Sequence, residues 1–230
     1  MTTTIPKRPH RPRGGLALAL GLAACAASAP PPEPQPAAPR PFLLAMPCRL
    51  TVHAALAPEQ PGQTSTPTVV VAQSLAGDQP AAPGVVELRQ SATGLSPQFA
   101  VVPVGTTLRF CNDDDICHRY FSTSPAAAFD LQPLQPGTAA ECALAQPGPV
   151  QVYCALHKSR QATVVVVPTA HFAILDAAGS GTIADLEPGR YRVELWADGA
   201  PRCHTTVDIG PGEPNEVVLP ADDDGSRGQR

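Results

Sequence analysis

The stretch VYCALHKSRQAT, residues 152–163, joins two runs of strand-forming residues. Side chains alternate between the two faces of a strand, so Val150, Val152 and Cys154 are expected to share one apolar face. Cys154 then ends a strand, and His157 follows in the loop. A thiolate and an imidazole at this spacing fit a metal site, a catalytic pair or a buried structural cysteine. Which of these three interpretations holds depends on whether other residues of the chain supply further ligands or catalytic groups.

Short runs of β-branched and apolar residues, separated by turn residues, follow one another from residue 48 onward. No apolar repeat of helical period persists, and 29 prolines and 18 glycines disfavour long helices. Runs this short, bounded by Pro, Gly and Asp, predict an all-β protein built of sandwiches. The expected strands are 49–55, 67–73, 85–90, 98–104, 106–111, 139–145, 149–154, 162–168, 171–175, 181–184, 189–197, 203–209 and 215–219.

The overall charge bears on the class of partner. The chain has 230 residues and a formal net charge of −4, and its sequence pI is about 5.8. A chain of this charge offers no general attraction to nucleic acid or to an anionic membrane surface. We therefore expect no nucleic-acid partner.

The N-terminal segment is typical of an export signal. Four basic residues precede the apolar run GGLALALGLAA, which is too short to span a bilayer as a stable helix. The run ends in Leu22-Ala23-Ala24-Cys25, which resembles the bacterial lipobox and implies a lipid anchor on Cys25. The alternative is ordinary cleavage after Ala29, the end of a small-x-small site. Both predict export, to the periplasm or cell envelope, and the lipobox adds attachment to a membrane.

Several motifs in segment 103–167 occur together in a fixed order. They are Val104-Gly-Thr-Thr-Leu-Arg-Phe-Cys-Asn112, His118, Pro147-Gly148, Tyr153-Cys154, His157 and the run Ala162–Val166. In this order and spacing the segment resembles the plastocyanin-like cupredoxins, which implies a Greek-key sandwich that holds one copper ion. The resemblance makes His118, Cys154 and His157 the ligands, and two His with one Cys are the trigonal set of blue-copper sites.

The segment departs from the plastocyanin pattern at two positions. No Met follows His157; the residues there are Lys-Ser-Arg-Gln, and Gln161 is the best candidate for the weak axial ligand. Arg119 stands where plastocyanins often carry an Asn that supports the site. A cupredoxin fold without metal is therefore the alternative to a copper site.

The flanks of this segment carry a second resemblance. RLTVHAALAPEQPG at 49–62 and FAILDAAGSGTIADLEPGRYRVELWADG at 172–199 are similar to a carboxypeptidase-regulatory-like (transthyretin-like) sandwich. The whole order resembles bacterial periplasmic methylamine-utilisation or plastocyanin-like proteins, in which a cupredoxin is inserted into such a sandwich. The expected organisation is a lipoprotein signal peptide at 1–25, a Pro-rich linker at 26–45, the regulatory-like sandwich at 46–80 and 168–220, the cupredoxin domain at 81–167, and a disordered tail at 221–230.

Five cysteines remain once the lipid and copper candidates are set aside. Export makes disulfides the default for them, although connectivity does not follow from sequence. Cys111 and Cys117 bracket the turn before the first copper ligand and are a plausible local bridge. Cys48 and Cys203 are candidates for a bridge within the small sandwich. For Cys142, burial as a small hydrophobic side chain is a sufficient explanation.

Two alternatives concern chemistry beside the copper candidates. Asp113-Asp114-Asp115 is either a solvated acidic turn or a docking patch for a basic redox partner. A catalytic Cys–His pair would need an orienting Asn or Asp and a Gly-rich nucleophile turn, and we find neither signature, so we do not expect an enzyme. The sequence thus predicts an exported copper protein that passes single electrons to a redox partner. The alternative is a copper-free, copper-storing or chaperoning module of an envelope assembly.

Overall fold

The computed structural model of the chain describes residues 47–56, 66–78, 81–82, 84–158, 161–212 and 214–220. All of them belong to one compact unit, Phe42–Arg230. These residues form sixteen strands joined by turns, and no helix occurs among them. The described part accordingly contains no helix that is long and apolar enough to cross a membrane. The prediction of an all-β protein is confirmed, whereas the predicted signal peptide with Cys25, the linker and the tail lie outside the described residues.

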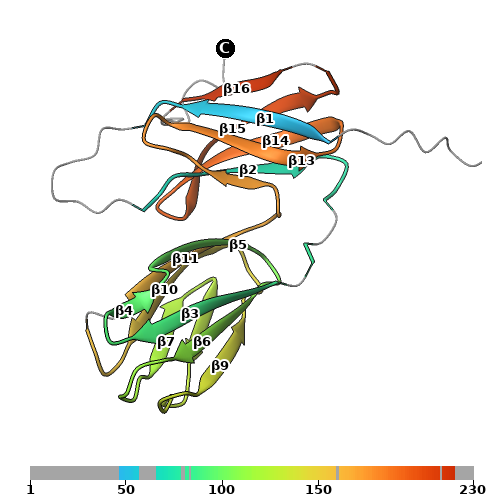
Figure 1. Cartoon of the computed structure of the whole chain (residues 1–230). Helices are drawn as coiled ribbons and strands as arrows, with labels where there is room; N and C mark the ends of the chain where they lie inside the picture. Colours follow the sequence, from blue (N-terminus) through green and yellow to red (C-terminus); the bar gives the residue numbers. More distant parts are fainter. Residues whose placement is uncertain are drawn as a thin grey trace, which may run out of the picture. The chain divides into compact units, whose positions relative to one another are not determined.

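Nine strands, β3 to β11, form a two-sheet sandwich (Figure 1). One sheet has the order β5-β11-β10-β7-β8 and the other β4-β3-β6-β9. β5 pairs with β11 and β3 pairs with β6 in parallel, and the remaining neighbours are antiparallel. The bounds are β3 (Val85–Ser91), β4 (Gly94–Ser96), β5 (Phe99–Pro103), β6 (Thr107–Asn112), β7 (Tyr120–Ser124), β8 (Ala127–Asp130), β9 (Ala139–Ala143), β10 (Gly148–Cys154) and β11 (Gln161–Val167).

The other seven strands form a second sandwich from segments on both sides of the first in the sequence (Figure 1). Its sheets have the orders β13-β1-β16 and β12-β2-β14-β15. The chain therefore starts this sandwich with two strands, forms the nine-stranded one, and returns for the last five. The bounds are β1 (Cys48–Ala54), β2 (Val69–Ser74), β12 (Phe172–Ile174), β13 (Ser180–Leu186), β14 (Gly189–Ala197), β15 (Ala200–Ile209) and β16 (Asn215–Leu219).

Two valine-rich strands, β2 and β11, are buried on both faces. In β11, Val164 and Val166 belong to the core of the nine-stranded sandwich. Val165 and Val167 point the other way, into a cluster that they share with Val69 and other residues of the second sandwich. An uninterrupted apolar run is what a strand covered on both faces requires, since an alternating strand would put polar side chains into one of the two layers.

The burial of β10 follows the alternation expected from its sequence. Val150, Val152 and Cys154 are buried, whereas Tyr153 is 38% exposed on the opposite face. Strands β4, β7 and β8 were not expected from composition. GLS has no β-branched or aromatic residue and AAFD has one, so pairing with neighbouring strands, not local propensity, makes β4 and β8 strands. In β7, YFSTS, three of the five residues favour a strand, but the run shows no alternation of apolar and polar residues.

Candidate metal centre

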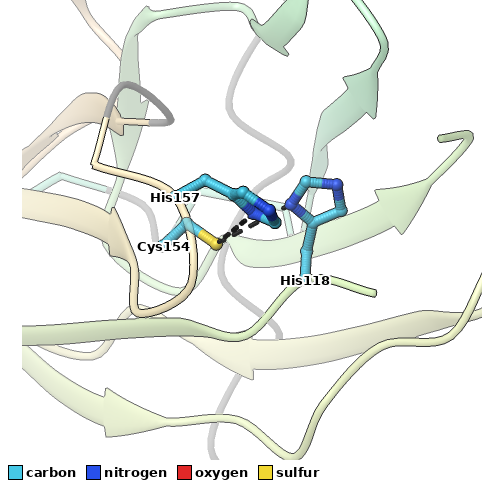
Figure 2. A group of neighbouring side chains, drawn as sticks. All are labelled: His118, Cys154 and His157. Carbon is cyan, nitrogen blue, oxygen red and sulfur yellow. Dashed lines mark hydrogen bonds between the residues drawn. The ribbon is translucent and has the colours of Figure 1, made fainter. Parts of the chain in front are cut away.

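Three side chains converge at one end of the nine-stranded sandwich. Cys154 Sγ lies 3.7 Å from His118 Nδ1 and 3.6 Å from His157 Nδ1. The three ligand atoms lie within 4.8 Å of one another. Figure 2 shows both imidazole rings turned toward the sulfur. Among the His, Cys, Asp and Glu residues of the described part, this is the group found able to hold a metal ion.

Each of the three residues is placed by a different piece of the sandwich. His118 forms an isolated bridge with Leu134, with backbone hydrogen bonds in both directions, and comes just before β7. Cys154 is the last residue of β10 and pairs with Tyr120, the first residue of β7. His157 lies in the loop that follows β10. The end of β10 and the bridge just before β7 therefore fix two of the groups, and the loop after β10 supplies the third.

The distances fit a single ion bound between these side chains. Zinc sites have bonds of about 2.0–2.1 Å to imidazole nitrogen and about 2.3 Å to thiolate sulfur. With an N–metal–S angle between tetrahedral and trigonal, such bonds place the nitrogen and the sulfur about 3.6–3.8 Å apart. The observed 3.6 and 3.7 Å fall in that range. Two imidazoles and one thiolate are also the equatorial donor set of type 1 copper. The residues present thus fit a copper ion.

A buried carboxylate completes the surroundings of His118. His118 Nε2 lies 3.1 Å from Asp114 Oδ2, and the side chains are 0% and 5% exposed. Burial raises the pKa of the Asp114 carboxyl, but hydrogen bonds from the Asp115 backbone N–H and from His118 outweigh it, so the pKa lies below its ordinary value. Asp114 is therefore an ionised acceptor beside the candidate ligand.

The three acids of the Asp113–Asp115 turn do not share one environment, whereas the sequence predicts a single one. Neither a solvated turn nor a docking patch describes Asp114, which is buried against His118. Asp113 is exposed and forms an ion pair with Arg89 at 2.8 Å. The signal that could have separated the three acids is spacing: Asp114 stands four residues before the candidate ligand, close enough for a short loop to fold back onto it.

The two positions that depart from the plastocyanin pattern both lie away from the three ligand atoms. Arg119 forms two hydrogen bonds to Asp130, at 2.9 and 2.6 Å, and both partners are exposed. Gln161 is exposed and pairs across the sheet with Tyr153. Paired residues share a face, and Tyr153 faces away from Cys154. The structure therefore does not bring Gln161 to the metal group as an axial ligand.

The remaining cysteines divide between the two sandwiches. Cys111 and Cys117 are free thiols, so the suggested disulfide between them is not formed here. Gln135 Nε2 lies 3.8 Å from Cys117 Sγ. Cys48 and Cys203 belong to the same buried core, where their suggested pairing stays a prediction. Burial raises the pKa of the Cys142 thiol to about 11.

Comparisons with known proteins find distant similarities to solved structures. No model of a known protein family matches the chain, and no curated protein matches it. A solved purple cupredoxin from Nitrosopumilus maritimus is similar at 26% identity and a TM-score of 0.33, over 36% of this chain and 99% of that chain. A reduced mutant of amicyanin is similar at 19% identity and a TM-score of 0.34, over 37% and 85%. A second amicyanin mutant, in a Cu(I) state, has 17% identity and a TM-score of 0.34, over 44% and 99%. Because these TM-scores lie below 0.5, we assign the site from its own geometry alone.

Proposed function

We propose that this chain is an exported copper protein of the cupredoxin type that carries single electrons. The observation that carries the proposal is the convergence of His118 Nδ1, Cys154 Sγ and His157 Nδ1 at the end of a β-sandwich. A bound copper ion would supply one-electron oxidation and reduction. The proposal assigns the chain no catalytic turnover of its own.

The side chains around the group support rapid exchange of an electron. Cys154 and His118 are buried, and strand β10 and the backbone bridge to Leu134 hold them, so little rearrangement of these groups is needed when the charge at the site changes. His157 is only partly buried. Its neighbour Leu156 is 54% exposed. We propose that a redox partner protein docks over this loop, because it carries the ligand nearest to solvent.

Export and anchoring belong to the proposal through the N-terminal sequence. The apolar run and the Leu22–Cys25 tetrapeptide support secretion with a lipid on Cys25, followed by a Pro-rich spacer. A tether of this kind would keep the copper domain in the periplasm or cell envelope, near a membrane. Metabolic labelling with a radioactive fatty acid, compared between the natural chain and Cys25→Ala, tests this part; equal labelling would contradict it.

The redox function can be tested by cycling the copper-loaded protein between its two states. We expect a reversible one-electron wave in voltammetry, and repeated reduction and reoxidation should return the same visible spectrum with one copper per chain. His157→Ala should abolish the reversible wave, whereas His204→Ala, in β15 of the second sandwich, should leave it unchanged. Copper release on the first reduction would contradict the proposal.

The number of ligands favours a second candidate, copper storage or transfer. Among the described His, Cys, Asp and Glu residues, the group has three members. A thiolate with two imidazoles also suits Cu(I). A transfer protein would give up Cu(I) to a competing chelator within minutes, whereas an electron carrier would retain it through many cycles. A chain that binds no copper at all would leave only a copper-free module of an envelope assembly.

A further inference from the structure

Outside the three ligand atoms, one buried contact of the site has no assigned role: the pair formed by Asp114 and His118. We propose that Asp114 is a positioning residue that fixes His118 as the Nε2–H tautomer, presents Nδ1 to the metal and strengthens it as a donor for oxidised copper. This inference rests on the proposed copper site. It names the group that orients and tunes one ligand.

The two nitrogens of His118 have different neighbours. Nε2 lies 3.1 Å from Asp114 Oδ2, and Nδ1 lies 3.7 Å from Cys154 Sγ. A neutral imidazole carries one N–H donor and one acceptor nitrogen, and an ionised carboxylate can only accept. Nε2 must therefore hold the proton in this contact. The lone pair on Nδ1 then faces the sulfur, where the metal would be bound.

A closed set of hydrogen bonds holds the carboxylate in place. Its second oxygen, Oδ1, accepts from the Asp115 backbone N–H at 2.9 Å, and the Asp114 N–H donates to Asn112 Oδ1 at 3.0 Å. Asn112 Nδ2 donates to the carbonyl oxygens of Ile116 at 2.8 Å and of Leu134 at 3.0 Å. Asn112 thus ties both ends of the loop that carries the aspartate.

The same Leu134 forms the backbone bridge with His118, so the carboxylate and the imidazole are held against one frame. Both side chains are almost fully excluded from water. Water therefore cannot replace the carboxylate as the partner of Nε2 without opening the loop. The orientation of the ring is set before any metal is present.

A carboxylate does more than a neutral acceptor would do at this position. Hydrogen bonds to a charged acceptor are roughly twice as strong as neutral ones, and they make the opposite nitrogen of the imidazole more electron-rich. A more electron-rich ligand stabilises Cu(II) more than Cu(I). Asp114 should consequently lower the reduction potential of the bound metal relative to a site without it.

The test compares Asp114→Asn with Asp113→Asn in the full chain. Each removes one carboxylate, at adjacent positions, but the side chain of Asp113 is exposed and pairs with Arg89, which is exposed as well. The Asn amide in place of Asp114 can donate to Nε2 and so favour the Nδ1–H tautomer. The first measurement is the tautomer of His118 in the metal-free protein, from the nitrogen chemical shifts of its ring. The second is the pair of affinities for Cu(II) and Cu(I), measured with competing chelators.

We expect the Nε2–H tautomer in the natural chain and in Asp113→Asn, and a shift toward Nδ1–H in Asp114→Asn. The affinity for Cu(II) should fall about 10–100-fold in Asp114→Asn, and the affinity for Cu(I) should fall less. Each factor of ten by which the loss of Cu(II) affinity exceeds the loss of Cu(I) affinity raises the reduction potential by about 59 mV.

Two results would overturn the role of Asp114. One is an Nδ1–H tautomer of His118 in the natural chain; this measurement needs no variant, so it decides the matter even if Asp114→Asn does not fold. The other is an Asp114→Asn protein whose tautomer and ratio of copper affinities match those of Asp113→Asn, which would make the contact merely structural. Failure of the natural chain to bind copper would instead overturn the proposed function, and the tautomer would still report whether Asp114 orients the ring.

Discussion

Removing the hydroxyl of Tyr120 should destabilise the sandwich beneath the candidate metal centre. Tyr120 is fully buried and its hydroxyl donates to Gln90 Oε1 at 2.9 Å, while Gln90 Nε2 donates to the Ser91 carbonyl oxygen. The Tyr120 ring stacks on Phe110, with ring centroids 4.9 Å apart, and Tyr120→Phe keeps this stacking. The change therefore removes the tyrosine donor of a buried acceptor, Gln90 Oε1. Leaving such a group unsatisfied costs about 1–3 kcal/mol.

Urea unfolding of the metal-free protein measures this loss as a lower midpoint at an unchanged m-value. The matched control is Tyr153→Phe, which removes a hydroxyl from an exposed tyrosine on the neighbouring strand and should change stability by no more than about 0.5 kcal/mol. The double variant Tyr120→Phe with Gln90→Leu removes both partners and should recover part of the loss. Equal stability of Tyr120→Phe and Tyr153→Phe would refute the reasoning.

Three further predictions concern other parts of the chain. Because the pKa of Cys142 is about 11, the rate of its alkylation should rise about tenfold per pH unit from pH 8 to pH 10. Peptide mapping measures this rate, and a plateau near pH 9 would contradict the raised pKa. Gly179 has a φ of 74°, and an added Cβ would strike the Ala54 carbonyl oxygen. Gly179→Ala should therefore lower stability by more than the roughly 1–2 kcal/mol expected for Gly137→Ala, whose φ is 76° but whose surroundings are open; equal losses in urea unfolding would count against the close contact. Gln161→Ala should leave the visible spectrum of the copper-loaded protein unchanged, because the side chain lies on the face opposite Cys154; a shifted band would show that Gln161 reaches the metal.

Most of the fold could be predicted from the sequence because its strands are marked by local patterns. The alternation through Val150, Val152 and Cys154 fixes which face of β10 is buried. The valine runs of β2 and β11 indicate strands covered on both sides. Strands β7 and β8 carry no such pattern. They are strands because they pair with their neighbours. Register is a property of two segments at once, so a single segment cannot reveal it.

The candidate site could be predicted only in part for the same reason. His118, Cys154 and His157 follow from residue type and order, and the structure brings them together. Asp114 looked like one of three solvated acids, because burial of a carboxylate depends on the loop that Asn112 closes around it. Gln161 looked close to His157 in sequence, but the pairing of β10 with β11 turns it to the other face.

The central claim, that His118, Cys154 and His157 bind one copper ion, is tested most directly by titrating the purified chain with Cu(II) and recording its visible spectrum. We predict an intense thiolate-to-copper band that saturates at one copper per chain. Cys154→Ser should lose the band, while Cys142→Ser, which removes a thiol outside the group, should keep it. A natural chain that stays colourless at saturating Cu(II), or a band that survives in Cys154→Ser, would contradict the account.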